Sequence, residues 1–227
     1  SSELSKNVEA RIIWGGDSTV NKFKTFITKP RCIDLAFANR YSISLIDSNK
    51  LGKLNTNDLA ILTKKFYNDT YTMDQFGCSS PNSVFWLGKN NIAKKKFWFE
   101  LSKLVNKVYD LDLSGANKKI SNLMNYTLNK KKKFKTNIKD FNLLTLRSGK
   151  LNFENHQKIN FGTFLEINLK NINSLKKYTS EKLQTITYYG TDFKSVKNFI
   201  IKNKIKGIDR IVPIGRAFDI TPEWDGI

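Results

Sequence analysis

The sequence predicts an α/β fold in which a central, mainly parallel or mixed sheet is flanked by helices. Short apolar runs of strand length alternate with segments of helical periodicity along the chain. The 227 residues are 40% hydrophobic, which is enough for one sizeable core or one and a fraction. We find no internal repeat in the sequence and no Pro/Gly-rich linker that divides it. These observations indicate an ordinary α/β protein and do not by themselves predict a function.

The first half of the chain begins with a strand that ends at a pair of glycines. A polar segment with capping residues then opens a helix, and another helix starts at a run of Asn, Thr and Asp. The elements expected here are a strand at 10–14, a helix from 17 to 26, strands at 32–35 and 41–46, and a helix that starts at 55–58 and ends near 68–69. A polar loop of small residues, 70–81, follows this helix.

The second half continues the alternation. A strand at 83–87 ends in a glycine, and a strongly apolar helix follows whose core stripe is Phe97, Leu101, Leu104, Val105 and Val108. The remaining expected elements are a helix at 115–128, a strand at 161–169, a short helical turn at 174–180, a strand at 183–189, a helix at 193–201 and a strand at 209–214.

The net charge of +19 raises the possibility of a nucleic-acid-binding module. However, only 6 of the 39 basic residues are Arg, the residue that clamps phosphates and bases in two-pronged contacts. The densest lysine run, 130–133, has no aromatic neighbour except Phe134. We therefore keep nucleic-acid binding as an alternative, and expect a basic rim to attract the phosphates of a nucleotide or of coenzyme A.

The two cysteines, Cys32 and Cys78, are too few for a disulfide framework in a chain of this length, and they indicate a reducing, cytoplasmic location. A single histidine and no metal-ligand spacing predict no metal site. No apolar run is long enough for a membrane span. Both ends of the sequence are typical of a fragment.

Cys78 lies in the polar loop between a helix and a strand, and Gly77 and Ser79 flank it. Such small neighbours leave the thiol accessible, and the amides of Cys78 and Ser79 can donate to a developing oxyanion. Asp74 and Gln75 can orient the thiol, although a turn carboxylate that caps backbone amides is an equal reading of Asp74. Cys32, in an apolar strand, fits a buried structural thiol.

The turn Gly15-Gly16-Asp17-Ser18 joins a strand to a helix N-terminus, which is an anion-binding geometry. The residues alone favour a simple tight turn over a binding site.

Three ordered blocks resemble one family. Residues 68–86, NDTYTMDQFGCSSPNSVFW, look like the active-site segment of the bacterial fatty acyl-CoA reductases of bioluminescence operons (LuxC-like), which are distant members of the aldehyde dehydrogenase superfamily. The other blocks are RIIWGGD at 11–17, with RCID at 31–34 and RYS at 40–42, and LQT at 183–185 followed by GIDRIVPIGRAFDITPEWDG at 207–226. They cover nearly the whole chain.

The resemblance implies that Cys78 attacks an acyl thioester, expels coenzyme A and holds the acyl group, which hydride from NADPH reduces to a fatty aldehyde. It implies a cofactor-binding role for Gly15, Gly16, Asp17 and Ser18. It also implies an aldehyde dehydrogenase-like fold, in which residues 1–35 end a nucleotide-binding domain and residues 36–227 form the catalytic thiol domain. Acyl-CoA or an acylated partner protein, an acyl-protein synthetase and a second copy of the chain are the implied partners.

Two departures from the superfamily pattern stand out. The block that carries its hydrolytic glutamate corresponds to residues 36–40, AFANR, which contain no carboxylate. Loss of this base suits a reductase, because hydrolysis would waste the acyl intermediate. The glutamate that holds the cofactor ribose also has no counterpart, and Glu166 is not assigned to it. Since most of the nucleotide-binding domain is expected upstream, this chain alone should bind NADPH poorly and be inactive in hydride transfer.

A cysteine hydrolase or thioesterase that pairs Cys78 with His156, the single histidine, is the second enzymatic alternative. The setting of His156, Asn155-His156-Gln157-Lys158, is typical of a polar loop and argues against this pair.

Overall fold

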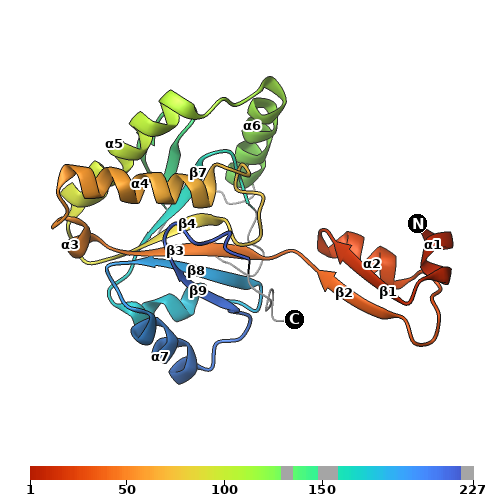
Figure 1. Ribbon diagram of the computed structural model, residues 1–227. Helices are drawn as coiled ribbons and strands as arrows, with labels where there is room; N and C mark the ends of the chain where they lie inside the picture. Colours follow the sequence, from red (N-terminus) through yellow and green to blue (C-terminus); the bar gives the residue numbers. More distant parts are fainter. Residues whose placement is uncertain (129–134, 148–157, 221–227) are drawn as a thin grey trace. The chain divides into compact units, whose positions relative to one another are not determined.

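The computed structural model describes residues 1–128, 135–147 and 158–220, and of residues 135–139 it describes the backbone alone. The chain forms two compact units, residues 1–40 and residues 41–220 (Figure 1). Each unit has its own sheet.

The smaller unit consists of α1 (Ser2–Asn7), β1 (Ala10–Trp14), α2 (Asp17–Lys24) and β2 (Ile33–Phe37). The two strands are parallel, and Ala10 to Trp14 pair in register with Ile33 to Phe37. The sequence prediction of a strand at 10–14 is confirmed, whereas the helix ends at Lys24 and not at residue 26.

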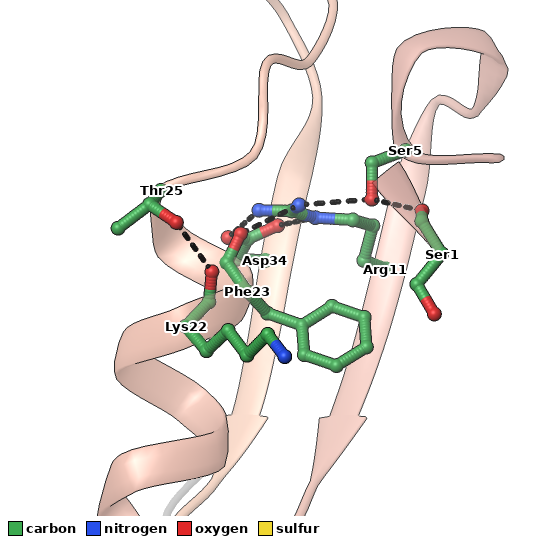
Figure 2. Close-up of polar contacts among 7 residues, drawn as sticks. All are labelled: Ser1, Ser5, Arg11, Lys22, Phe23, Thr25 and Asp34. Carbon is green, nitrogen blue, oxygen red and sulfur yellow. Dashed lines mark hydrogen bonds and ion pairs between the residues drawn. The ribbon is translucent and has the colours of Figure 1, made fainter. Parts of the chain in front are cut away.

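An ion pair joins the two strands of the smaller unit. The Arg11 guanidinium binds both carboxylate oxygens of Asp34, with Nε–Oδ1 at 2.7 Å and Nη2–Oδ2 at 2.5 Å (Figure 2). Its third nitrogen, Nη1, donates to Ser5 Oγ at 3.2 Å and to the Phe23 carbonyl at 3.0 Å. The guanidinium lowers the pKa of Asp34. Arg11 therefore ties both strands to α1 and to the end of α2.

The two faces of this small sheet differ. Ile13 is buried on the face that also carries Arg11, together with Val20 of α2. On the other face, Ile12 is 71% exposed, Trp14 69% and Ile33 61%. No described residue of this unit covers that apolar face.

The larger unit is built on a seven-stranded sheet in the order β5-β6-β7-β4-β3-β8-β9. Its strands are β3 (Tyr41–Asp47), β4 (Pro81–Leu87), β5 (Lys135–Lys139), β6 (Leu144–Arg147), β7 (Thr163–Asn168), β8 (Leu183–Tyr189) and β9 (Arg210–Pro213). All neighbouring pairs are parallel except β5 and β6. This confirms the predicted mainly parallel, mixed sheet.

Helices cover both faces of this sheet (Figure 1). They are α3 (Ser48–Leu51), α4 (Thr56–Thr70), α5 (Asn91–Val108), α6 (Leu113–Leu128), the 3₁₀ helix η1 (Ile172–Tyr178) and α7 (Phe193–Asn203). Successive residues of a strand enter opposite cores: Trp86 of β4 packs with α4 and α5, and Phe85 packs in the core that includes α7 and η1. Fully buried aromatic residues dominate the α4–α5 side.

The structure corrects three sequence expectations. Val108, which was predicted in the core stripe of α5, is 49% exposed and does not belong to the core. Cys32 precedes β2 in a turn and is partly exposed, so the expected buried strand thiol was wrong. The strands β5 and β6 were not predicted, since each is too short to give a clear periodic signal.

Candidate functional site

Cys78 lies in the loop between α4 and β4, as predicted, and its side chain is partly exposed. Two consecutive residues of this loop, Asp74 (φ 49°) and Gln75 (φ 63°), have left-handed backbone conformations. Non-glycine residues rarely adopt this conformation, so surrounding contacts must hold it. Both residues make such contacts.

Gln75 is fully buried and uses its whole amide on backbone groups. Its Oε1 accepts from the Gly162 amide at 2.8 Å and from the Thr163 amide at 3.1 Å. Its Nε2 donates to the carbonyls of Pro81 and Thr163, both at 3.3 Å. Gln75 thus joins both ends of the loop to the start of β7, and it acts on the position of Cys78 through the backbone.

Asp74 also binds neighbours of the loop. Its carboxylate accepts from the Tyr109 hydroxyl at 2.6 Å, and its carbonyl accepts from the Phe161 amide at 3.2 Å. Burial, with the hydrogen bond to Asp74, raises the pKa of Tyr109. The side chain of Asp74 is therefore engaged with the end of α5.

The backbone at Cys78 is fixed from β3. Ser42 Oγ donates to the Cys78 carbonyl at 2.7 Å and accepts from the Thr185 amide at 3.2 Å. A Cβ on Gly77 would lie 2.7 Å from a ring carbon of Phe218, so a larger residue would displace the loop or this ring. The packing of Phe218 thus favours glycine beside the cysteine.

A buried carboxylate, Asp69, fixes the end of α4 near the same loop. It accepts from the amides of Gly215 at 2.6 Å and Ala217 at 3.0 Å, and its carbonyl accepts from Ser80 Oγ at 2.8 Å. Burial raises the pKa of Asp69 to about 6. Asp69 was not predicted as a functional residue, because an acidic residue at the end of a helix is usually exposed to solvent.

Donor groups at Cys78 are available for a ligand. Among the described residues, the amides of Cys78 and Ser79 have no hydrogen-bond acceptor. The Ser79 side chain is buried, and its hydroxyl has no partner in the described part of the chain. Unmatched donors of this kind are costly in a fold and are typical of sites that stabilise a developing anion.

Burial lowers the pKa of two cations, Lys158 and Arg210. Lys158 is partly buried, and burial lowers the pKa of its ammonium to about 8. Arg210 donates to the carbonyls of Ala217 and Asp219, both at 2.6 Å. Lys158 was not predicted, because one lysine among 33 carries no local signal, and Arg210 was noted only as part of the block 207–226.

The predicted cofactor residues lie in the smaller unit, at the turn from β1 to α2. A Cβ on Gly16 would meet no atom within 4 Å, and α2 has no side-chain cap at its N-terminus. Gly15 packs against Thr19, and its amide donates to the Phe37 carbonyl at 3.1 Å. The Asp17 carboxylate accepts from the Asn39 amide at 3.1 Å.

The structure places Asp74, Gln75 and Ser79 in the same loop as Cys78, although the side chains of Asp74 and Gln75 bind other groups than the thiol, while Gly15, Gly16, Asp17 and Ser18 belong to the other unit. His156 and the lysine run at 130–133 lie outside the described residues.

The Glu166 carboxylate binds other side chains of the larger unit. It is 1% exposed and accepts from the indoles of Trp86, at 3.2 Å, and Trp98. Arg147 Nη2 lies 3.4 Å from the same carboxylate. These internal contacts are compatible with leaving Glu166 without a cofactor role.

Within the described ranges, no helix has the length and apolar composition needed to cross a membrane. The same residues contain no group of three or more His, Cys, Asp and Glu side chains that could hold a metal ion.

Comparison with known proteins gives a consistent family and fold. The sequence model of the acyl-CoA reductase (LuxC) family matches residues 1–227. No curated protein sequence gives a significant match. Among solved structures, an NAD-dependent aldehyde dehydrogenase from Sinorhizobium meliloti is similar at a TM-score of 0.67 and 10% identity, covering 97% of this chain and 46% of that one.

Two further structures show the same relation. Lactaldehyde dehydrogenase from Escherichia coli has a TM-score of 0.63 at 10% identity, with 98% of this chain and 49% of that chain covered. Betaine aldehyde dehydrogenase from Staphylococcus aureus in complex with NAD⁺ has a TM-score of 0.62 at 10% identity, with 93% and 45% covered. This chain thus spans about half the length of the solved structures that it matches, and these similarities concern the fold.

Proposed function

Because the chain belongs to the acyl-CoA reductase (LuxC) family, we propose that it is the part of an acyl-CoA reductase that carries the acyl group on Cys78. The observation that carries this proposal is the loop at Cys78, which combines a partly exposed thiol with two amides, those of Cys78 and Ser79, that have no acceptor among the described residues.

In the proposed first step, the Cys78 sulfur attacks the carbonyl carbon of an acyl thioester. Negative charge develops on the carbonyl oxygen, and the amides of Cys78 and Ser79 are the donors that would stabilise it. Coenzyme A then leaves as its thiol, and the acyl group remains on Cys78 as a thioester. The buried Ser79 hydroxyl is a third donor close to this position in the chain.

Gln75 and Asp74 are proposed to position this machinery. The Gln75 amide holds the loop through four backbone contacts, and the Asp74 carboxylate is held by Tyr109. Neither side chain is needed as a proton carrier in this scheme. Their loss would act on the geometry of the Cys78 loop.

A reduced nicotinamide cofactor, which we propose is NADPH, would supply the hydride that converts the acyl thioester to a thiohemiacetal and then a fatty aldehyde. The turn Gly15–Ser18 is the proposed contact in this chain. Its fit is mixed: Gly16 leaves open space at an uncapped helix N-terminus, whereas the Asp17 carboxylate would repel a phosphate placed beside it. The turn suits the nicotinamide end of the cofactor better than its phosphates.

The smaller unit supports the proposed division into the end of a nucleotide-binding domain and a thiol domain. A two-stranded sheet with an open apolar face at Ile12, Trp14 and Ile33 is marginal by itself. We propose that further chain of a longer protein covers this face. It follows that residues 1–227 alone bind NADPH poorly and do not transfer hydride.

The remaining proposals concern the surroundings of the enzyme. We propose acyl-CoA or an acylated partner protein, such as the product of an acyl-protein synthetase, as the acyl donor, a homo-oligomeric assembly and a cytoplasmic location. The family match gives no support to the hydrolase or nucleic-acid alternatives.

The test is the intact mass of the chain after it is mixed with a long-chain acyl-CoA. We expect a mass increase of one acyl group that is absent in Cys78→Ala and present in Cys32→Ser. Because the donor can be an acylated protein, the same measurement is made with the longer protein and an acyl-protein donor. A longer protein that reduces acyl groups without Cys78 would refute the proposal.

A further inference from the structure

The loop that carries Cys78 buries its polar residues and exposes its apolar ones. Gln75 is fully buried, and the Asp74 carboxylate accepts a hydrogen bond at 2.6 Å. In contrast, Met73 is 51% exposed and Phe76 is 55% exposed. A surface loop ordinarily shows the opposite arrangement, because polar groups are better solvated by water than apolar ones. The exposed apolar side chains of this loop are therefore candidates for contact with a ligand.

The backbone of the loop holds these side chains in place. The Phe76 amide donates to the Met73 carbonyl at 2.7 Å, which closes a tight turn around the two residues with left-handed backbone conformations. The Gln75 side chain joins this turn to the start of β7. The Phe76 ring meets the buried Phe161 ring edge to face, with centroids 5.2 Å apart. Met73 and Phe76 therefore stand on a turn that is fixed from below.

A third apolar side chain reaches the same loop from the segment after β9. A Cβ on Gly77 would lie 2.7 Å from a ring carbon of Phe218 and 3.7 Å from Met73 Sδ. Phe218 and Met73 thus flank the residue that directly precedes Cys78. We call the side chains of Met73, Phe76 and Phe218 the apolar rim.

Two buried charged residues hold Phe218 in this position. The Asp69 carboxylate accepts from the Ala217 amide at 3.0 Å. The Arg210 guanidinium donates to the carbonyls of Ala217 and Asp219, both at 2.6 Å. Both chain neighbours of Phe218 are thereby fixed. Burial of a carboxylate and a guanidinium costs hydration, and a fold that spends this cost on one short segment requires that segment in a defined place.

We propose that the apolar rim binds the acyl chain of the substrate and makes the site selective for long chains; this inference rests on the proposed function. An acyl group on Cys78 has its carbonyl oxygen at the amides of Cys78 and Ser79, and its chain extends away from the sulfur over the surface beside the loop. The rim adjoins Cys78 through Gly77. A chain that crosses the rim removes its methylene groups from water against apolar side chains.

The test is the second-order rate of acylation of Cys78 by butyryl-CoA and by dodecanoyl-CoA. It is followed by intact mass in the full chain carrying Cys32→Ser, or in the longer protein if only that protein is acylated. We expect the parent to react faster with dodecanoyl-CoA. Met73→Ala and Phe76→Ala should each slow the reaction with dodecanoyl-CoA about tenfold, which corresponds to about 1.4 kcal/mol and to the burial of about two methylene groups. Both variants should keep the rate with butyryl-CoA within about twofold of the parent.

Phe99→Ala is the matched control, because Phe99 of α5 is 58% exposed in the same unit and lies outside the apolar rim. It should change neither acylation rate. Iodoacetamide carries no acyl chain, so it should alkylate Cys78 at the same rate, within about twofold, in the parent and in all three variants. The alkylation rate thus separates loss of chain binding from distortion of the loop.

The ratio of the two acylation rates decides the proposal. If neither Met73→Ala nor Phe76→Ala lowers the ratio of the dodecanoyl rate to the butyryl rate, the proposal is overturned. A rim that instead contacts a second copy of the chain or another protein segment would give that result. A parent chain and a longer protein that form no acyl adduct with any donor would refute the proposed function, and this inference with it.

Discussion

Replacing Gln75 by Ala tests whether one buried amide holds the Cys78 loop. The side chain is 0% exposed, and its removal leaves the Gly162 amide without its acceptor at 2.8 Å. The Thr163 amide keeps a second acceptor, the Asn160 carbonyl at 3.1 Å, so its loss is partial. One buried donor left unpaired costs about 1–3 kcal/mol, and the cavity adds to this. We expect the free energy of unfolding to fall by about 3 kcal/mol.

Urea denaturation followed by tryptophan fluorescence measures this loss. Trp86 and Trp98 are fully buried in the larger unit, whereas Trp14 is 69% exposed, so the signal reports mainly on the larger unit. With a slope of about 2–3 kcal/mol per molar urea, the midpoint should fall by about 1–1.5 M.

Thr72→Ala is the matched control, because Thr72 is an exposed residue of the same loop. It should change stability by less than about 0.5 kcal/mol. The reasoning is refuted if Gln75→Ala is as stable as Thr72→Ala. If the hydrogen bonds of Gln75 position the thiol as proposed, Gln75→Ala also slows the acylation of Cys78 in the absence of urea.

Three further predictions concern charged groups. Burial raises the pKa of Asp69 from 3.8 to about 6. Between these pH values the native state binds a proton that the unfolded state does not bind. The stability of the fold therefore rises as the pH falls from 6 to 3.8, by at most about 3 kcal/mol from this group. Asp69→Asn should remove this component from urea midpoints measured between pH 4 and 7, and an unchanged pH profile would contradict it. Glu166→Gln should lower stability by about 1–3 kcal/mol, because two indole donors and Arg147 lose a charged acceptor, and a melting temperature equal to that of the parent would count against this account. Arg11→Met should speed hydrogen exchange in β1 and β2 and leave β3 and β4 unaffected, since its contacts are all within the smaller unit; equal protection of β1 and β2 in both proteins would disprove this.

Much of the fold could be predicted from the chain because its signals are local. The period of apolar residues identified α4 and α5, and Asn55 was recognised as a helix start, where its side chain indeed accepts from the Asp58 amide at 2.8 Å. The short strands β5 and β6 were missed, since they carry little periodic signal and depend on the pairing of β5 with β6 and of β6 with β7. Cys32 was misplaced because strand boundaries near prolines and turns are set by pairing, and β2 begins one residue later.

The candidate site also has features that the sequence predicted and features that only the tertiary structure revealed. Sequence alone determined the family and predicted Cys78 as the nucleophile, because the signals lie in one contiguous segment and in ordered blocks of residues. Only the tertiary structure revealed Lys158 and Asp69, which lie 80 residues after Cys78 and 9 residues before it. Burial shifts the pKa of both groups, and this burial arises only when β7, α4 and the loop after β9 pack together around the start of β4.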